Sequence, residues 1–283
     1  MDRSRIALRC IRATMFAVWR HRPIIMSSII VLSLVSPDTR YAAWSRGSVR
    51  AASKTAPSKC DRSKFKLILD VGHTAEAPGA RSARNIPEFD FNLRLAKRIE
   101  DKLKSEGFAQ TSLLVTEGPK RPSLFKRAAA INNSGADLAL SIHHDSVPDS
   151  FLEEWEFEGT KSHFSDRFSG YSLFVSHDNP KFWTSLRFAR LLGNRMKAQG
   201  LQYARQYAQA VMGRYRRKLL DKKAGVYRYD QLIVLMRTRV PAVLLEAGSI
   251  INRDEELAMA STERQDMIGA AVVGAVKEFC ASR

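Results

Sequence analysis

The chain has 283 residues, enough for one large domain or two small domains with a sizeable core, and its hydrophobic fraction of 45% is ordinary for a globular protein. Its 46 lysine and arginine residues exceed its 29 acidic residues, and the net charge of +17 favours contact with polyanions such as nucleic acid, an anionic membrane face or an acidic cell-wall polymer. Residues 1–60 carry about half of this excess, and the sequence contains no zinc-finger, RNP or P-loop pattern, so no nucleic-acid partner is expected.

The first 43 residues have the pattern of a secretory signal peptide. Six arginines and a single acid precede Pro23, and an apolar run of 13 residues follows from Pro23 to Val35. A membrane-spanning helix needs about 20 apolar residues, so we expect a chain that is exported without a permanent membrane span. A basic leader without a targeting role is the alternative for residues 1–43. Residues 44–64 are rich in Ser, Ala, Arg and Lys and predict a linker to a folded domain over residues 65–283.

From residue 65 onward, strand patterns and helix patterns alternate. Apolar runs predict strands over residues 66–71, 113–116, 138–143, 171–176, 232–236 and 242–246. Apolar residues at helical spacing predict helices from Pro87 to Gly107, over residues 123–133, over residues 186–196 before Gly200, and over residues 265–280. This alternation predicts an α/β domain with a largely parallel sheet that helices cover on both faces.

Residues 147–170 interrupt the alternation. The segment is acidic within a basic protein and directly follows His143 and His144. Loops of this length inside compact domains are often functional or disordered, so the segment is expected to be an insertion beside any site that these histidines form.

Two of the three cysteines frame the folded domain. Cys60 precedes the first predicted strand and Cys280 ends the last predicted helix, whereas Cys10 lies in the leader. In an oxidising compartment Cys60 and Cys280 could pair and tie the two ends of the domain together. Two free thiols are the alternative.

Four acidic or imidazole side chains stand at the edges of apolar runs. His73, His143 and Glu246 follow predicted strands, and Glu88 lies in the first turn of a predicted helix. Groups at the carboxyl ends of strands in an open α/β sheet converge on one crevice. Two histidines and a glutamate can hold a catalytic zinc and leave one position for water, while the remaining glutamate serves as a base. The alternatives are a carboxylate favoured by the helix dipole for Glu88 and a buried carboxylate paired with a basic residue for Glu246.

The motifs around these residues follow one another in a recognisable order. They are His73, Pro87–Asn92, Ser141–His144 and Leu244–Asn252, and with them the chain resembles the amidase-3 family, the zinc-dependent N-acetylmuramoyl-L-alanine amidases, over about residues 65–280. The resemblance implies a single mixed, mostly parallel sheet flanked by helices. It also implies that His73, Glu88 and His143 bind zinc and that Glu246 is the catalytic carboxylate. The implied substrate is the amide between N-acetylmuramic acid and L-alanine in peptidoglycan.

The chain departs from the family pattern near the implied ligands. Thr74 stands where the family usually has glycine, and Asp145 stands where asparagine is usual. His144 is a competing ligand beside His143. Because adjacent side chains of a strand point to opposite faces, only one of the two histidines should reach the metal, and the motif favours His143.

The sequence therefore predicts an exported, periplasmic zinc amidase of peptidoglycan, active in cell-wall remodelling or daughter-cell separation. One alternative is a zinc amidohydrolase or carboxypeptidase of small peptides, and another is a non-catalytic cell-wall-binding regulator on the same fold. The acidic segment over residues 147–170 is expected to cover part of the zinc cleft until an activator protein moves it. A solvated surface loop is the alternative for this segment.

Overall fold

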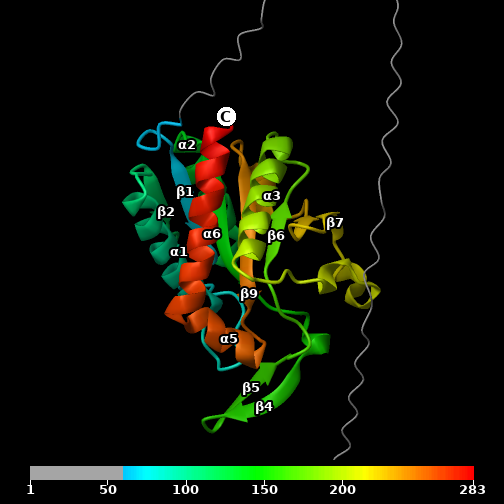
Figure 1. Cartoon of the computed structure of the whole chain (residues 1–283). Helices are drawn as coiled ribbons and strands as arrows, with labels where there is room; N and C mark the ends of the chain where they lie inside the picture. Colours follow the sequence, from blue (N-terminus) through cyan, green and yellow to red (C-terminus); the bar gives the residue numbers. More distant parts are fainter. Residues whose placement is uncertain (1–59) are drawn as a thin grey trace, which may run out of the picture. The chain divides into compact units, whose positions relative to one another are not determined.

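The computed structural model describes residues 60–283, which form a seven-stranded mixed sheet flanked by helices (Figure 1). The strand order is β2-β1-β3-β9-β6-β8-β7; β2, β1, β3 and β9 are mutually parallel, and β6 pairs with β9 in the antiparallel direction. The strands of this sheet are β1 (Leu67–Val71), β2 (Thr111–Leu114), β3 (Leu138–Asp145), β6 (Ser172–Val175), β7 (Lys218–Asp221), β8 (Val226–Arg228) and β9 (Ala242–Ser249). The predicted α/β class with a mixed, mostly parallel sheet is confirmed.

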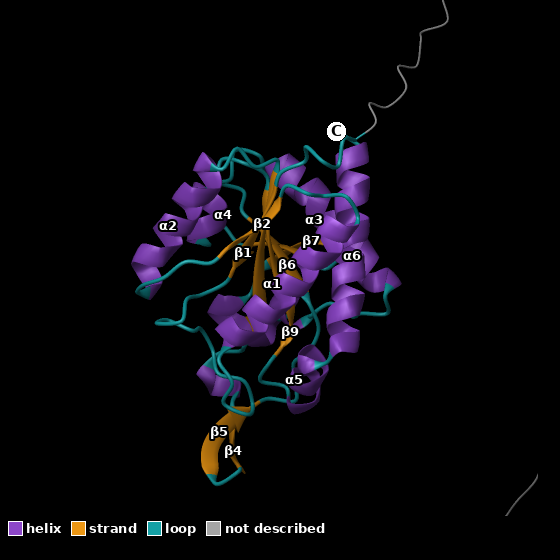
Figure 2. Cartoon of the chain, turned by 90° about the vertical axis from the view of Figure 1, so that its left-hand side faces the viewer, coloured by secondary structure: helices purple, strands orange, loops and turns teal. Residues whose placement is uncertain are grey.

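Helices cover both faces of the sheet (Figure 2). Helices α1, α3 and α6 share a core with one face, and α2 and α4 pack on the other. The helices are α1 (Glu88–Ser105), α2 (Lys120–Asn133), α3 (Phe182–Ala198), α4 (Ile233–Arg237), α5 (Arg253–Ala260) and α6 (Thr262–Ala281), with short 3-10 turns η1 (Asp149–Phe151), η2 (Gln206–Ala208) and η3 (Ala210–Tyr215). The termini of the described domain meet where Cys60 and Cys280 form a disulfide with their Cα atoms 5.4 Å apart.

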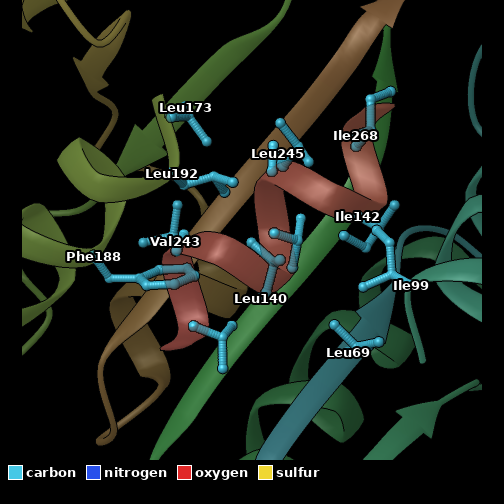
Figure 3. Close-up of a cluster of buried hydrophobic side chains, with 14 of the residues drawn as sticks. Leu69, Ile99, Leu140, Ile142, Leu173, Phe188, Leu192, Val243, Leu245 and Ile268 are labelled. Atoms are coloured by element: carbon cyan, nitrogen blue, oxygen red, sulfur yellow. The ribbon is translucent and has the colours of Figure 1, made fainter. Parts of the chain in front are cut away.

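The central strands are apolar on both faces because both faces are covered. Leu140 and Ile142 of β3 join Ile99, Phe188 and Ile268 of the helices in the larger core (Figure 3). Ala139, the residue before Leu140, faces the smaller core under α2 and α4. This two-residue alternation decides which side chains at the ends of β3 and β9 can meet.

The strand predicted over residues 232–236 is wrong. The segment forms the short helix α4, whose Val234 and Leu235 pack toward α2. A short apolar run has the same composition in a buried strand and in a buried helical turn, so periodicity does not separate the two. The short strands β7 and β8 and the helix α5 were not predicted either.

The acidic segment contains an antiparallel hairpin, β4 (Glu153–Phe157) and β5 (Thr160–Phe164), which projects from the end of the domain opposite the carboxyl terminus (Figure 1). The leader expected over residues 1–43 and most of the expected linker lie outside the described residues. Within residues 60–283, no helix combines the length and the apolarity needed to cross a bilayer.

Candidate metal centre

His73, Glu88 and His143 come together at the carboxyl ends of β1 and β3. Nε2 of His73 lies 2.9 Å from Oε2 of Glu88, and Nδ1 of His143 lies 3.0 Å from Oε1 of the same carboxylate. One potential ligand atom from each of the three residues lies within 4.8 Å of the others. Two imidazole nitrogens and one carboxylate are a donor set that holds a metal ion and leaves a coordination position open.

Two glycines, Gly72 and Gly79, leave the space that these side chains occupy. A Cβ atom on Gly72 would lie 2.6 Å from the ring of His143, and one on Gly79 would lie 2.5 Å from Oε2 of Glu88. His73 itself has a φ of 69°, a left-handed conformation that is uncommon for a residue with a side chain and that recurs at functional sites. The Thr74 hydroxyl closes the following turn by accepting from the amide of Ala77 at 2.9 Å, and it donates to the carbonyl of Gly118 at 2.8 Å. The departure at Thr74 is therefore compatible with the cluster.

Glu88 is held from several sides at the start of α1. The amide nitrogen of Ala80 and the side-chain nitrogen of Asn92 each donate to its carboxylate at 3.2 Å. Burial alone would raise the pKa of the Glu88 carboxyl, but hydrogen bonds and charges from His143 and His73 outweigh burial and hold this pKa well below its ordinary value. Glu88 is thus an anion, as a metal ligand must be.

The pKa of His143 is lowered by burial, against the opposing hydrogen bond to Glu88. A lowered pKa leaves the imidazole neutral, with a lone pair that a metal ion can use. His144 points to the other face of the sheet, where its Nδ1 lies 2.8 Å from Oδ1 of Asn92 and its ring packs near Phe91. Its pKa is lowered by burial to about 3. The structure therefore brings His143, and not His144, to the cluster.

Glu246 stands on β9 directly opposite His143 on β3, so that both side chains lie on the same face of the sheet. It lines a cavity of about 290 Å³, and its buried Oε2 has no hydrogen-bond partner among the described residues. Burial, followed by the charges of Asp145 and Glu88, raises the pKa of the Glu246 carboxyl well above its ordinary value. Glu246 forms no ion pair in the described part of the chain, which removes the alternative of a carboxylate paired with a basic residue.

The contact between Asp145 and Tyr207 was not predicted from the sequence. The Tyr207 hydroxyl lies 2.6 and 2.8 Å from the two carboxylate oxygens of Asp145, and burial raises the pKa of Asp145 to about 7. Tyr207 and the segment that follows it wall the cavity that contains Glu246. Tyr207 carries no sequence signal because it lies in a segment without a strand or helix pattern. Asn92, in contrast, follows Glu88 at the i+4 spacing that places two residues on one face of a helix.

A buried ion pair joins helix α2 to strand β1, one of the strands that carry the cluster. Nε and a terminal nitrogen of Arg127 on α2 lie 2.6 and 2.5 Å from the carboxylate oxygens of Asp70 on β1, and Ser141 donates to the same carboxylate at 2.7 Å. The side chains of Asp70 and Arg127 are almost fully buried. This network ties α2 to the two strands that present His73 and His143.

The β4–β5 hairpin packs beside the metal centre rather than over it. Trp155 and Ser162 each donate to the carbonyl of Ala83 at 2.8 Å, and the guanidinium of Arg84 lies over the ring of Trp155. Neither the cavity at Glu246 nor a second cavity of about 380 Å³ beside His73 is lined by a residue of the hairpin. Val147 and Pro148, at the start of the acidic segment, do line the cavity at Glu246.

Residues 67–278 match the N-acetylmuramoyl-L-alanine amidase family. The chain belongs to this family. It is 22% identical over 257 residues to the N-acetylmuramoyl-L-alanine amidase AmiC of Escherichia coli O6:H1, covering 82% of this chain and 57% of that protein. The chain thus spans little more than half the length of AmiC.

Solved structures share the fold. The amidase Ami1 from Mycobacterium smegmatis superposes with a TM-score of 0.59 at 20% identity, covering 78% of this chain and 98% of that one. The amidase CwlD from Clostridioides difficile, solved in complex with the GerS lipoprotein, gives a TM-score of 0.51 at 19% identity and covers 76% of this chain and 98% of that one. At these identities the likeness extends to the fold alone.

Proposed function

We propose that this chain is a zinc-dependent hydrolase of the amide between N-acetylmuramic acid and L-alanine in peptidoglycan, with His73, Glu88 and His143 as zinc ligands and Glu246 as the catalytic carboxylate. The observation that carries the proposal is the cluster of two imidazoles and one carboxylate with Glu246 one strand away, in a member of an amidase family. The open, partly aromatic cavity beside Glu246 leaves room for a substrate larger than a water molecule.

The proposed reaction adds water across the amide. A zinc ion held by His73, Glu88 and His143 would supply Lewis acidity toward the amide carbonyl and would lower the pKa of water toward about 7. Glu246 accepts a proton from the water and passes it to the nitrogen of the leaving L-alanine, and its raised pKa suits a group that must hold that proton in between. The hydroxyl adds to the carbonyl carbon, so the products are a lactyl carboxylate and a free L-alanine amino terminus.

The activity and the metal are tested together on purified sacculi. The zinc-loaded protein should contain one zinc ion per chain and release free L-alanine amino termini. His143→Ala should lose both properties because it removes one ligand from the cluster. The matched control is His177→Ala, which removes an exposed histidine from the end of β6.

Two outcomes would overturn the proposed function. If the wild-type protein binds no zinc, the assignment of His73, Glu88 and His143 as zinc ligands is wrong. A zinc-loaded protein that releases no amino termini from sacculi fails the activity, and one that cleaves only small soluble peptides supports the alternative amidohydrolase. Retention of zinc by His143→Ala would show that His143 is not required as a ligand, and His144 would then be tested in its place.

We propose that residues 1–43 are an export signal, that residues 44–64 are a linker to a catalytic domain over residues 65–283, and that the enzyme acts in the periplasm. The basic and apolar order of the leader supports export. The disulfide between Cys60 and Cys280 supports an oxidising compartment. A peptidoglycan substrate also requires a location outside the cytoplasm.

We propose that an activator protein acts on residues 147–170. The hairpin exposes Glu154 and Glu156 on its outer face, and the segment that leads into it supplies Val147 and Pro148 to the wall of the Glu246 cavity. A partner that pulls on the hairpin would therefore shift this wall.

Removing the hairpin tests whether the segment restrains the enzyme. Replacing residues 153–164 with a short Gly-Ser turn should raise sacculus hydrolysis severalfold, because Phe151 and Leu152, which pack in one apolar cluster with Val147 of the cavity wall, then lose the hairpin that follows them. Zinc content and the circular dichroism spectrum report whether the variant folds. Unchanged or lower activity in a folded variant would count against restraint by this segment.

A further inference from the structure

The end of the domain opposite the metal centre carries a cationic cleft. This cleft has a volume of about 620 Å³ and is formed where the chain enters β3 and β9, where α3 begins and where α6 ends. Its charged lining residues are Lys181, Arg187, Arg239, Arg283 and Asp137. Four lysine or arginine side chains therefore line the cleft against a single acidic side chain.

The acidic side chain does not neutralise the cleft. Asp137 is already engaged, since it lies 2.6 Å from the guanidinium of Arg283 and accepts a hydrogen bond from the amide of Lys66 at 2.9 Å. Lys181 and Arg239 are exposed and form no ion pair within residues 60–283. The cleft thus presents free positive charge to solvent.

Trp183 stands beside this charge. Its side chain is 76% exposed, the largest exposure among the exposed large hydrophobic residues of the described domain. It lies in the first turn of α3, between Lys181 and Thr184 of the cleft. An exposed indole next to lysine and arginine is the combination that favours the interface between a bilayer and water, where the ring enters the headgroup region and the cations attract anionic lipids.

The two ends of the domain face in opposite directions. Asp137 precedes β3 and His143 lies near its carboxyl end, so six strand residues, or about 20 Å, separate the cleft from the metal centre. The disulfide between Cys60 and Cys280 places the start of the domain at the end that carries the cleft. Figure 1 shows the carboxyl end of α6 at that end and the β4–β5 hairpin at the other.

We propose that the face formed by Trp183, Lys181, Arg187 and Arg239 docks on the surface of an anionic phospholipid bilayer. Docking in this orientation holds the metal centre on the side of the domain that faces away from the bilayer. The exposed indole favours a bilayer over a soluble polyanion, because the ring gains by leaving water only where an apolar phase is present. This inference does not depend on the hydrolytic activity.

Vesicle binding by the full chain tests the proposal. The wild type should bind vesicles of phosphatidylglycerol and phosphatidylcholine more tightly than vesicles of phosphatidylcholine alone. Arg239→Ala should weaken binding to the anionic vesicles about fivefold, the loss expected for one basic residue near a charged bilayer, and Trp183→Ser should weaken it at least as much. All variants should keep their zinc content and their hydrolysis of sacculi in solution.

Matched controls lie outside the cleft. Leu257→Ser removes another exposed apolar side chain, on α5, and Lys222→Ala removes an exposed lysine from the turn after β7. Both should bind vesicles as the wild type does. Because the apolar run of the leader is present in every variant, its own contribution to binding cancels in these comparisons.

A second readout locates the indole directly. Lipids with brominated acyl chains should quench the part of the fluorescence that is lost in Trp183→Phe, and they should do so only in anionic vesicles. Absence of this quenching, or equal vesicle binding by the wild type, Trp183→Ser and Arg239→Ala, would overturn the proposal. Displacement by soluble polyphosphate without quenching would identify a polyanion groove instead, and self-association without vesicle binding would identify a face between two copies of the chain.

Discussion

Replacing Glu246 with glutamine should lower kcat for sacculus hydrolysis by about 10²–10⁴-fold while the zinc content stays at the wild-type level. Glutamine has the same shape as glutamate but cannot accept the proton of the attacking water. Glu246 is not one of the three clustered ligand residues, so its loss should leave the metal in place. The measurement is the rate of amino-terminus release at saturating sacculi, together with zinc analysis of the same preparation.

An exposed glutamate provides the control for this variant. Glu154→Gln changes an exposed glutamate on the hairpin and should leave kcat unchanged. A Glu246→Gln variant with the wild-type kcat would show that the proton takes another route, for which Asp145, whose charge acts on Glu246, is the candidate. Loss of zinc from Glu246→Gln would show instead that the residue helps to hold the ion.

The second large effect concerns stability. Arg127→Met should lower the free energy of unfolding by about 3–5 kcal/mol, because it leaves the fully buried carboxylate of Asp70 without its cation. The double replacement Asp70→Leu with Arg127→Met should recover most of this loss, since an apolar pair of similar volume avoids the cost of burying charge. Urea unfolding at fixed zinc concentration, with the disulfide intact, measures both differences.

An exposed ion pair provides the control. Arg195 and Glu278 lie 2.9 Å apart with about half of each side chain exposed, so Arg195→Met should cost only about 0–1 kcal/mol. If Arg127→Met costs no more than Arg195→Met, then the buried pair does not stabilise the strands that present His73 and His143. If the double replacement is as unstable as the single one, the loss lies in packing rather than in an unpaired charge.

The parts of the fold that the sequence predicted are those with long or well-bounded patterns. The strand over residues 66–71 and the helix that begins after Pro87 have apolar spacing that only one regular structure satisfies. The run over residues 232–236 satisfies two structures equally, and only packing against α2 selects the helix. The strands β7 and β8 have four and three residues, too few for a period to be visible.

Some residues of the candidate site were likewise predictable from the sequence, and others were not. The positions of His73, His143 and Glu246 after apolar runs were sufficient to predict that they meet, because parallel neighbouring strands end at the same edge of a sheet. Local alternation left the choice between His143 and His144 open and only the family motif favoured His143, because the faces of β3 are assigned to particular helices only in the folded domain. Tyr207 lies in the short 3-10 turn η2 and joined the site only through the path of the chain between α3 and β7.

The sequence by itself therefore determined the α/β class, the family and the residues able to bind a metal, because apolar periodicity and short motifs are properties of neighbours along the chain. Only the tertiary structure decided that Glu246 has no basic partner within residues 60–283, that Asp145 is buried against Tyr207, and that Trp183 lies beside a cationic cleft. These features depend on burial and on contacts between distant segments. Such contacts are selected by the packing of the whole domain, which no local pattern records.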